Sequence, residues 1–339
     1  MKKNLKKFLL SLIIALGIIP GCAQPEKQDS QMNSYIFATT IIRKEQLPDI
    51  RRLAESIRTF GGKFANAPLW VFAATDDVLD DSAMIDSIIS LGVELNKFSH
   101  PEQVAWLYYA NKPYAAAQAE TLAVENNSAI LIWVDTDTIF LMEPEDFILP
   151  NNIALAYRTV MHNRAGSLYG RPPDTLWRRI YELAGLDDDM LFAMTTQADR
   201  QKIRAYFHCG LIVVRPQKGV LRRWAEYFTM LSQDSIIIEQ CRANIDKNVF
   251  LHQNVLTPAV LNILKRDEMI ELSDRYNYPL LFEKHYDATA PFNNLNDVVS
   301  IRIVISSDKV GPEWYKELVG PPDKIDWLKD RLFLGPNVH

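Results

Sequence analysis

LIWVDTDTIF, residues 131–140, is an apolar run that ends in two aspartates, Asp135 and Asp137, before apolar residues resume. An apolar run of this length is typical of a strand that is buried on both faces of a parallel sheet. In such sheets ligands bind at the carboxyl ends of the strands, which is where the two aspartates are expected to lie. The stretch therefore predicts an α/β fold and a ligand site at one edge of its sheet.

The residues before this stretch alternate between strand and helix patterns, and the alternation indicates a parallel sheet with helices on its faces. We expect an α/β fold with a mostly parallel, Rossmann-like sheet flanked by helices. The predicted strands are residues 35–42, 68–75, 93–98 and 129–135, and the predicted helices are residues 45–62, 81–92 and 111–126.

The second half of the chain is less regular, and no linker divides it from the first half. We predict one domain over residues 34–339, with a nucleotide-binding half at 34–160 and an acceptor-side half at 161–339. Pro258 is expected to bend or interrupt the last long helix. The predicted strands of this half are residues 151–160, 206–216 and 298–306, and the predicted helices are residues 175–186, 218–231 and 248–265.

The composition of the 339-residue chain limits its class of function. Its formal net charge is -5, and a protein that binds nucleic acid usually carries a basic face, so we expect no nucleic-acid partner. Hydrophobic residues make up 48% of the chain, which is enough for a large core.

The N-terminus reads as a targeting segment. A basic start is followed by an apolar run over residues 8–19, which is short for a membrane span, and then by Gly21 and Cys22. This pattern predicts a lipoprotein-type signal peptide over residues 1–22, lipidated at Cys22, and a flexible polar tether over residues 23–33. The protein would then be exported and membrane-associated. The alternatives are an ordinary signal peptide, or an uncleaved N-terminal anchor with a cytoplasmic domain.

Two cysteines remain if Cys22 carries a lipid. Export would permit a disulfide between Cys209 and Cys241. Their spacing has no metal-binding pattern, and we favour two partly buried free thiols.

Asp135 and Asp137 are two residues apart, so in an extended strand their carboxylates face the same region. At a separation of about 6 Å and an effective dielectric near 20, they would repel each other by roughly 3 kcal/mol. A cation between them would remove that repulsion, and carboxylate oxygens suit Mn²⁺ or Mg²⁺. Such an ion could also neutralise a departing nucleoside diphosphate.

Two other interpretations of the paired aspartates stay open. They could be the polar tip of a strand that meets solvent. They could also belong to a phosphatase of the haloacid dehalogenase type, in which the first aspartate is a nucleophile and the second a general acid. Against the phosphatase, Ile139 stands where that motif has Thr or Val, and about three strand–helix units precede the motif.

Four segments in order resemble glycosyltransferases of the GT-A fold, in particular family 8 and its relatives. The resemblance spans residues 34–278. The segments are WVDTDTIFLMEPEDF at 133–147, YFHCGLIVVRP at 206–216, FLHQNVLTPAVLN at 250–262 and ELSDRYNY at 271–278.

This resemblance implies transfer of a sugar from a nucleotide-diphosphate sugar to a glycan or a lipid-linked acceptor, with retention of the anomer favoured. It implies that Asp137 binds Mn²⁺ or Mg²⁺ directly, and that Asp135 binds the metal or the donor ribose. Thr39 and Thr40 would contact the base and ribose, although they could be ordinary turn residues. Lys112 could meet the diphosphate, or it could be a solvated surface lysine.

On the acceptor side, the resemblance gives candidate catalytic roles to His252 and Gln253, which could face the acceptor or the transferred sugar. Either histidine of the nearby motifs, His208 or His252, could instead be an ordinary core or surface histidine.

The chain departs from the family pattern at several positions. His208 and Cys209 replace Asn-Ser, and His252 replaces the Asp of an Asp-Gln pair. Residues 304–314 lack the late histidine that completes the family's metal shell, and His285 is a candidate replacement. The alternative function is therefore a catalytically weakened, membrane-tethered glycan-binding protein. Export favours this alternative, because nucleotide sugars are made in the cytoplasm.

Overall fold

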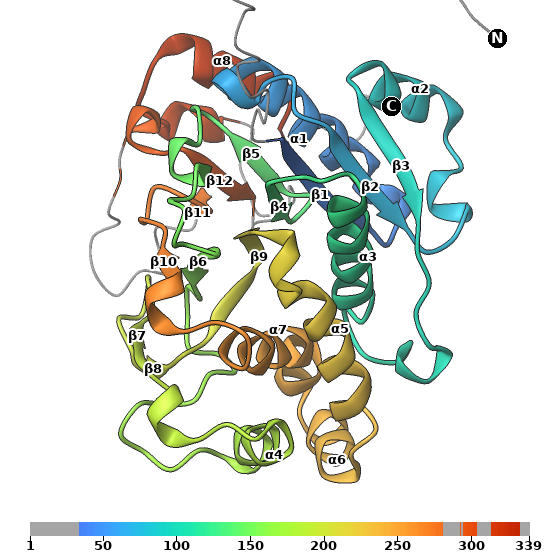
Figure 1. Cartoon of the computed structure of the whole chain (residues 1–339). Helices are drawn as coiled ribbons and strands as arrows, with labels where there is room; N and C mark the ends of the chain where they lie inside the picture. The colour runs from blue at the N-terminus through green and yellow to red at the C-terminus, as the bar shows by residue number, and fades with distance from the viewer. Residues whose placement is uncertain (1–33, 281–291, 293, 304–312, 333–339) are drawn as a thin grey trace, which may run out of the picture. The chain divides into compact units, whose positions relative to one another are not determined.

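The computed structural model describes residues 34–280, 292, 294–303 and 313–332 (Figure 1). The predicted signal peptide, Cys22 and the tether lie outside the described residues. So do His285 and most of the 304–314 segment. Within the described ranges, no helix is both long and apolar enough to cross a membrane.

A seven-stranded sheet forms the centre of the fold. Its fourth strand in spatial order is the one that ends just before Asp135. One strand, β9, runs antiparallel to both of its neighbours, and every other neighbouring pair is parallel. The predicted α/β class with a mostly parallel sheet is therefore confirmed. In spatial order the strands are β10 (Met269–Glu271), β6 (Leu155–Thr159), β9 (Phe207–Val214), β4 (Ile130–Val134), β1 (Tyr35–Ile41), β2 (Leu69–Ala73) and β3 (Val93–Lys97).

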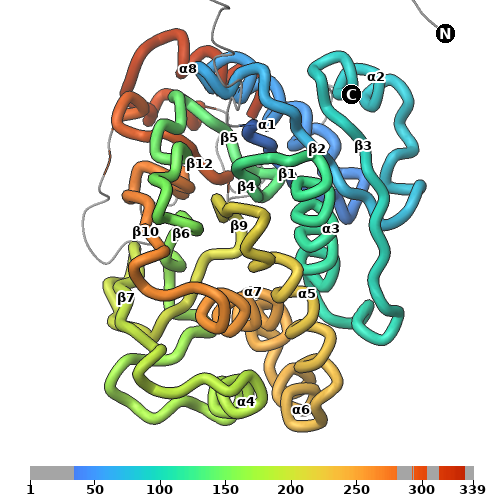
Figure 2. The backbone as a smooth tube through the Cα atoms, viewed as in Figure 1, coloured from blue at the N-terminus to red at the C-terminus, as the bar shows by residue number. Residues whose placement is uncertain are grey.

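Helices cover both faces of this sheet, as the tube in Figure 2 also shows. Successive side chains of a strand point to opposite faces of the sheet. Leu131 and Trp133 of β4 therefore pack in one core cluster, and Ile132 and Val134 pack in the other. The first face packs against α3, α5 and α7, and the second packs against α1 and α2. The helices are α1 (Leu47–Phe60), α2 (Ser82–Ser90), α3 (Asn111–Glu125), α4 (Thr175–Ala184), α5 (Val220–Leu231), α6 (Ser235–Ala243), α7 (Ile245–Leu261) and α8 (Pro322–Lys329).

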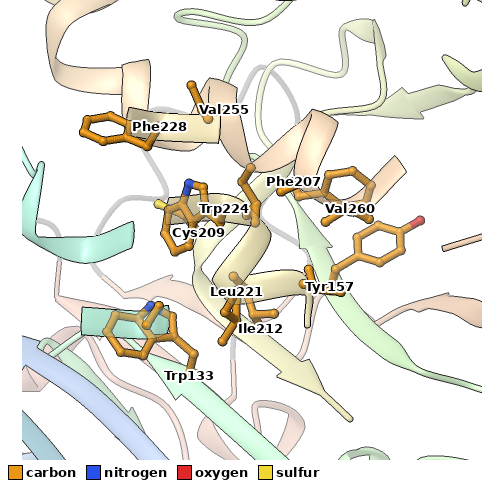
Figure 3. Close-up of a cluster of buried hydrophobic side chains, with 14 of the residues drawn as sticks. Trp133, Tyr157, Phe207, Cys209, Ile212, Leu221, Trp224, Phe228, Val255 and Val260 are labelled. Atoms are coloured by element: carbon orange, nitrogen blue, oxygen red, sulfur yellow. The ribbon is translucent and has the colours of Figure 1, made fainter. Parts of the chain in front are cut away.

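The core on the α3–α5–α7 face is dense with large side chains. Figure 3 shows Trp133 of β4, Trp224 of α5 and Val255 of α7 in one cluster with residues of β9. Trp133 and Trp224 are fully buried, and the indole nitrogen of Trp224 donates to the backbone oxygen of His252 at 2.7 Å. This packing holds α7 against β9, beside the end of β4.

A second sheet brings the C-terminal part of the chain to the end of β4. Directly after the two aspartates the chain enters β5 (Thr138–Phe140), which leaves the central sheet. There it pairs antiparallel with β12 (Ser300–Ile303), and β12 pairs parallel with β11 (Tyr278–Leu280). A separate hairpin is made by β7 (Ala193–Thr195) and β8 (Lys202–Arg204).

Several details differ from the sequence-based expectations. Pro258 lies inside α7 and does not interrupt it, although a bend was the other expected outcome. Proline removes one backbone donor, and the helix ends three residues later at Leu261. Helix α6 was not predicted, although Asp234 caps it by accepting from the N–H groups of Ile236 and Ile237. Strand β5 was not predicted either, because three residues are too few for a periodic signal.

Candidate active site at the end of β4

The Asp-Thr-Asp segment forms a tight turn rather than an extended strand tip. The N–H of Asp135 donates to the backbone oxygen of Gly210 at 3.0 Å, which is the last link to β9. The N–H of Thr138 then donates back to the oxygen of Asp135 at 3.2 Å. The turn redirects the chain from β4 into β5 and leaves both carboxylates at the junction of the two sheets.

Arg302 of β12 forms ion pairs with both aspartates and hydrogen bonds with Asp137. Its Nε and Nη2 donate to Oδ1 and Oδ2 of Asp137 at 3.2 and 3.0 Å, and Nη2 also lies 3.1 Å from Oδ2 of Asp135. The pairing of β12 with β5 sets this position, because Arg302 stands opposite Thr138 in the register. The two carboxylates therefore face one region, as predicted, with a guanidinium between them.

Lys112, in the first turn of α3, supplies a second cation. Its Nζ lies 2.5 Å from Oδ1 of Asp135 and 5.2 Å from the centre of the Tyr109 ring. Only 14% of the Lys112 side chain is exposed. Lys112 is thus an ion-paired residue of the site and not a solvated surface lysine.

The charges of this cluster balance within a largely buried space. Burial alone would raise the pKa of Asp135, but Lys112 and Arg302 outweigh it and hold that pKa well below its ordinary value. Burial would lower the pKa of Lys112, and the carboxylate of Asp135 reverses this and raises it. The pKa of Arg302 is likewise raised, because Asp137 and Asp135 outweigh its burial. Asp135, Lys112 and Arg302 therefore stay charged together.

His208 borders the cluster as a neutral ring. Burial, followed by the charge of Arg302, lowers its pKa well below the usual value. Its Nε2 lies 3.0 Å from Nη1 of Arg302, and its Nδ1 lies 3.0 Å from the backbone nitrogen of Gly210. A neutral imidazole has one acceptor nitrogen, so it accepts a full hydrogen bond from only one of these donors at a time.

Residue 210 must be glycine because the side chains of Asp135 and His208 approach its Cα closely. A Cβ at this position would lie 2.3 Å from Oδ2 of Asp135 and 2.7 Å from Cε1 of His208. Any side chain at residue 210 would therefore push the carboxylate out of its ion pairs.

The described residues do not fit a metal ion as they are arranged. Within the described part of the chain, no three His, Cys, Asp or Glu side chains come together as a metal-binding group. The carboxylate oxygens already face Arg302 and Lys112. A divalent ion about 4 Å from the guanidinium would be repelled by roughly 8 kcal/mol at an effective dielectric near 20, which cancels its attraction to one carboxylate at the same distance.

Thr39 and Thr40 lie at the predicted end of β1. The parallel register pairs Ala38 with Trp133, so Thr40 is level with Asp135 two residues further along. Both threonines are buried, and the hydroxyl of Thr40 donates to the backbone oxygen of Phe72 at 3.0 Å. The hydroxyl of Thr39 has no hydrogen-bond partner within the described ranges.

His252 and Gln253 of α7 contact β9 rather than the aspartates. Nε2 of His252 lies 3.1 Å from the sulfur of Cys209, and Oε1 of Gln253 accepts from the N–H of Cys209 at 3.2 Å. Burial, with a smaller contribution from Lys112, lowers the pKa of His252 to about 3. Burial also raises the pKa of the Cys209 thiol to about 11. The pair is therefore neutral at pH 7 and is not an activated thiolate.

Cys209 and Cys241 are both buried and free, so the free-thiol interpretation is confirmed over the disulfide.

A cavity of about 300 Å³ lies next to the ion-pair cluster. It is formed by residues that follow β1 and β3 and by the start of α3, and Tyr109 links it to Lys112. Trp106, Tyr108 and Tyr109, in the segment that leads into α3, are exposed aromatic residues. The lining residues are Ile42, His100, Ala105, Leu107, Tyr109, Ala110 and Asn111.

The sequence predicted that Asp135 and Asp137 face one region, but it did not predict the ion pair of Lys112 with Asp135 or the presence of Arg302. The signal was present, because Arg302 is a charged residue inside the apolar run of residues 298–306. A buried charge such as that of Arg302 needs a partner, and Asp135 and Asp137 were candidate partners. The pairing was not predicted because Arg302 is far from both aspartates in the sequence.

A family model described as the Rhodobacterales glycosyltransferase domain matches residues 49–262, which is more than half of the chain. The chain belongs to this glycosyltransferase family. The match includes Lys112, Asp135 and Asp137 but stops 40 residues before Arg302. Together with the mostly parallel sheet, membership confirms the predicted resemblance to glycosyltransferases of the GT-A type.

Solved structures of glycosyltransferases are also similar to the chain, at low identity. The bifunctional glycosyltransferase WbbM has a TM-score of 0.49 and 12% identity over 88% of this chain, which spans 52% of the WbbM chain, about half its length. The galactosyltransferase LgtC, solved with donor and acceptor sugar analogs, has a TM-score of 0.43 and 10% identity, covering 89% of this chain and 97% of LgtC. Mouse xyloside xylosyltransferase 1 has a TM-score of 0.43 and 9% identity, covering 80% of this chain and 97% of that one.

No curated protein matches the sequence closely enough to count as a relative. TM-scores below 0.5 are too low to transfer a donor or an acceptor to this chain.

Proposed function

We propose that this glycosyltransferase moves a sugar from a nucleotide-diphosphate sugar to a glycan or a lipid-linked acceptor, at the turn that follows β4. One observation carries the proposal. Two carboxylates and two cationic side chains meet at the carboxyl end of a central strand, beside a cavity of about 300 Å³. Ligands of open α/β sheets bind at this edge.

The nucleoside of the donor fits the cavity side of the site. Tyr109 offers an aromatic surface there, and Asn111 offers amide groups that could pair with a base. Thr39 and Thr40 lie just before the end of β1 at Ile41, and Ile42 lines this cavity; we assign the two threonines to the base and ribose, as the family resemblance implies. Asp135 is the second candidate for the ribose.

The diphosphate needs positive charge, because it leaves with a growing negative charge as the bond to the sugar breaks. The family resemblance implies that Mn²⁺ or Mg²⁺ on Asp135 and Asp137 supplies it. The side chains of Lys112 and Arg302 are the other source, and both lie at the carboxylates already. The geometry favours the side chains.

The acceptor side is assigned to α7 and β9. Gln253 and His252 remain the candidate residues there, with a role in orienting the acceptor or the transferred sugar. His252 is neutral and buried, so its contacts support a positioning role and not proton transfer. Transfer of a hexose with retention of its anomeric configuration is the reaction that the family 8 resemblance favours.

We also propose that the domain is tethered to a membrane through a lipid at Cys22. The alternative is an N-terminal anchor with the domain in the cytoplasm, where nucleotide sugars are made. The mass of the native N-terminal peptide decides between them. A diacylglyceryl modification on Cys22 supports lipidation, and an intact Met1 start supports the anchor.

The test of the function is donor binding and turnover by the full chain. UDP-, GDP- and dTDP-hexoses are each titrated by calorimetry, and release of the nucleoside diphosphate is then followed with and without Mn²⁺. We expect binding of one nucleotide class, with Asp137→Ala weakening it by about tenfold or more. Asp86→Ala, an exposed carboxylate in α2, is the matched control and should bind like the parent.

Failure of every nucleotide sugar to bind, in both conditions, would remove the transferase assignment. It would favour the glycan-binding alternative, which is then tested by titrating oligosaccharides in place of the donors.

A further inference from the structure

We propose that Arg302 is the resident cation of this site: its guanidinium occupies the place between Asp135 and Asp137 that a divalent metal would take, and the chain binds the donor diphosphate without a metal. The inference rests on the proposed function for the donor. It departs from the family resemblance on the metal.

The contacts of Arg302 are those of a bridging ion. Its planar fork holds Asp137 through two bonds, and the same Nη2 reaches Asp135. A guanidinium matches carboxylates in this two-pronged way, and its pKa keeps it charged at any physiological pH. One side chain thus satisfies oxygens of both aspartates, which is the task of a bridging metal.

The backbone fixes this arginine in place. Arg302 sits in β12, directly opposite Thr138 of β5, and the N–H of Ile303 donates to the oxygen of Asp137 at 3.3 Å. Ile301, on the other side, is fully buried in the third core cluster. Only 18% of the Arg302 side chain is exposed. It is held by the strand rather than extending from a surface, so a metal could enter only by breaking two ion pairs.

The charge balance leads to the same conclusion. Asp135 and Asp137 carry two negative charges, and Arg302 and Lys112 carry two positive ones. Before the donor binds, a divalent ion added to this set would leave a surplus of positive charge in a space where Asp135 is only 10% exposed. A surplus of that kind is costly in a poorly solvated site.

The two cations retain donors for a phosphate. Arg302 has five N–H groups: two donate to Asp137, one more on Nη2 is near Asp135, and at most one donates to His208, which leaves at least one. The ammonium of Lys112 has three N–H groups, and within the described ranges one of them meets a carboxylate. These remaining N–H groups can bond to phosphate oxygens while the ion pairs with the aspartates persist.

The experiment measures metal binding and nucleotide binding separately. Mn²⁺ alone is titrated into the metal-free full chain and followed by electron paramagnetic resonance, without nucleotide. In a second arm, UDP binding is measured by calorimetry in EDTA and in Mn²⁺, with GDP used if UDP does not bind. The variants are Arg302→Met, which removes the charge, and Arg302→Lys, which keeps the charge without the fork.

We expect no stoichiometric Mn²⁺ binding by the parent, and nucleotide affinity within about twofold in EDTA and in Mn²⁺. Arg302→Met should lose about tenfold or more of its nucleotide affinity in EDTA and gain Mn²⁺ binding, because its carboxylates are released. Arg302→Lys should lose less nucleotide affinity and gain no Mn²⁺ site.

Stoichiometric binding of Mn²⁺ by the parent, or loss of its nucleotide binding in EDTA, overturns the proposal. The parent protein decides this even if the variants do not fold. If no nucleoside diphosphate binds in either buffer, the proposed function fails, while the Mn²⁺ titration still reports on Arg302 by itself.

Discussion

Replacing Arg302 with methionine should destabilise the fold through the repulsion that it exposes. The nearest oxygens of Asp135 and Asp137 lie 3.1 and 3.0 Å from the same Nη2, so they are at most about 6 Å apart. At that distance and an effective dielectric near 20, two carboxylates repel by about 3 kcal/mol. We expect Arg302→Met to lower the free energy of unfolding by about that amount, since Lys112 compensates only one of the two charges.

A double-mutant cycle measures this directly. Asp137→Asn removes the second charge, so the double variant Arg302→Met with Asp137→Asn should be at least about 2 kcal/mol more stable than the sum of the single effects. Urea midpoints from circular dichroism give the four free energies. Additive single effects, within about 0.5 kcal/mol, would refute the reasoning, because they would mean that the guanidinium and Asp137 do not interact.

Three more predictions concern groups around this cluster. Gly210→Ala should lower the melting temperature and weaken donor binding, because its Cβ would lie 2.3 Å from Oδ2 of Asp135. Gly170→Ala, whose Cβ meets nothing within 4 Å, should cost only the ~1 kcal/mol of its left-handed backbone. His252 has a folded-state pKa of about 3, below its unfolded value, so its contribution to stability is complete above about pH 6.5 and is lost as the pH falls toward 3. His252→Gln should reduce the pH dependence of the free energy of unfolding by up to about 1.4 kcal/mol per pH unit, measured from urea midpoints at pH 7 and pH 5. An unchanged pH dependence would contradict the lowered pKa of His252. Cys209, with its pKa raised to about 11, should not react with a thiol reagent at pH 8 until the chain unfolds, and rapid labelling of the native protein would disprove its burial.

The local part of the fold could be predicted from the sequence, because its strands and helices carry their own periodic signals. The apolar run before Asp135 predicted a central strand, and alternation around it predicted the parallel sheet. Strand β9 was predicted as a strand, but its antiparallel direction was not, because direction depends on where a distant segment returns to the sheet. Strand β5 is too short to have a period.

The part of the candidate site that is made by residues close in sequence could be predicted. Asp135 and Asp137 share a turn, so their proximity follows from local order. Lys112 starts the helix that leads into their strand, but its ion pair with Asp135 was not predicted. Arg302 is 165 positions beyond Asp137, and only the pairing of β5 with β12 brings it there. The roles of Thr39, Thr40, Gln253 and His252 remain predictions.

The late position of β12 has a consequence for how the protein is made. A ribosome releases Asp135 and Asp137 long before it reaches residue 302, and β12 is the last strand of the described chain. Until then the emerging chain can build its central sheet but must keep two neighbouring carboxylates in water, with Lys112 paired to Asp135. Arrival of Arg302 both completes the electrostatics and adds a strand to β5. A nascent or truncated chain that ends earlier would therefore hold a folded sheet with an open acidic turn, and the last tenth of the sequence would convert it into the finished site.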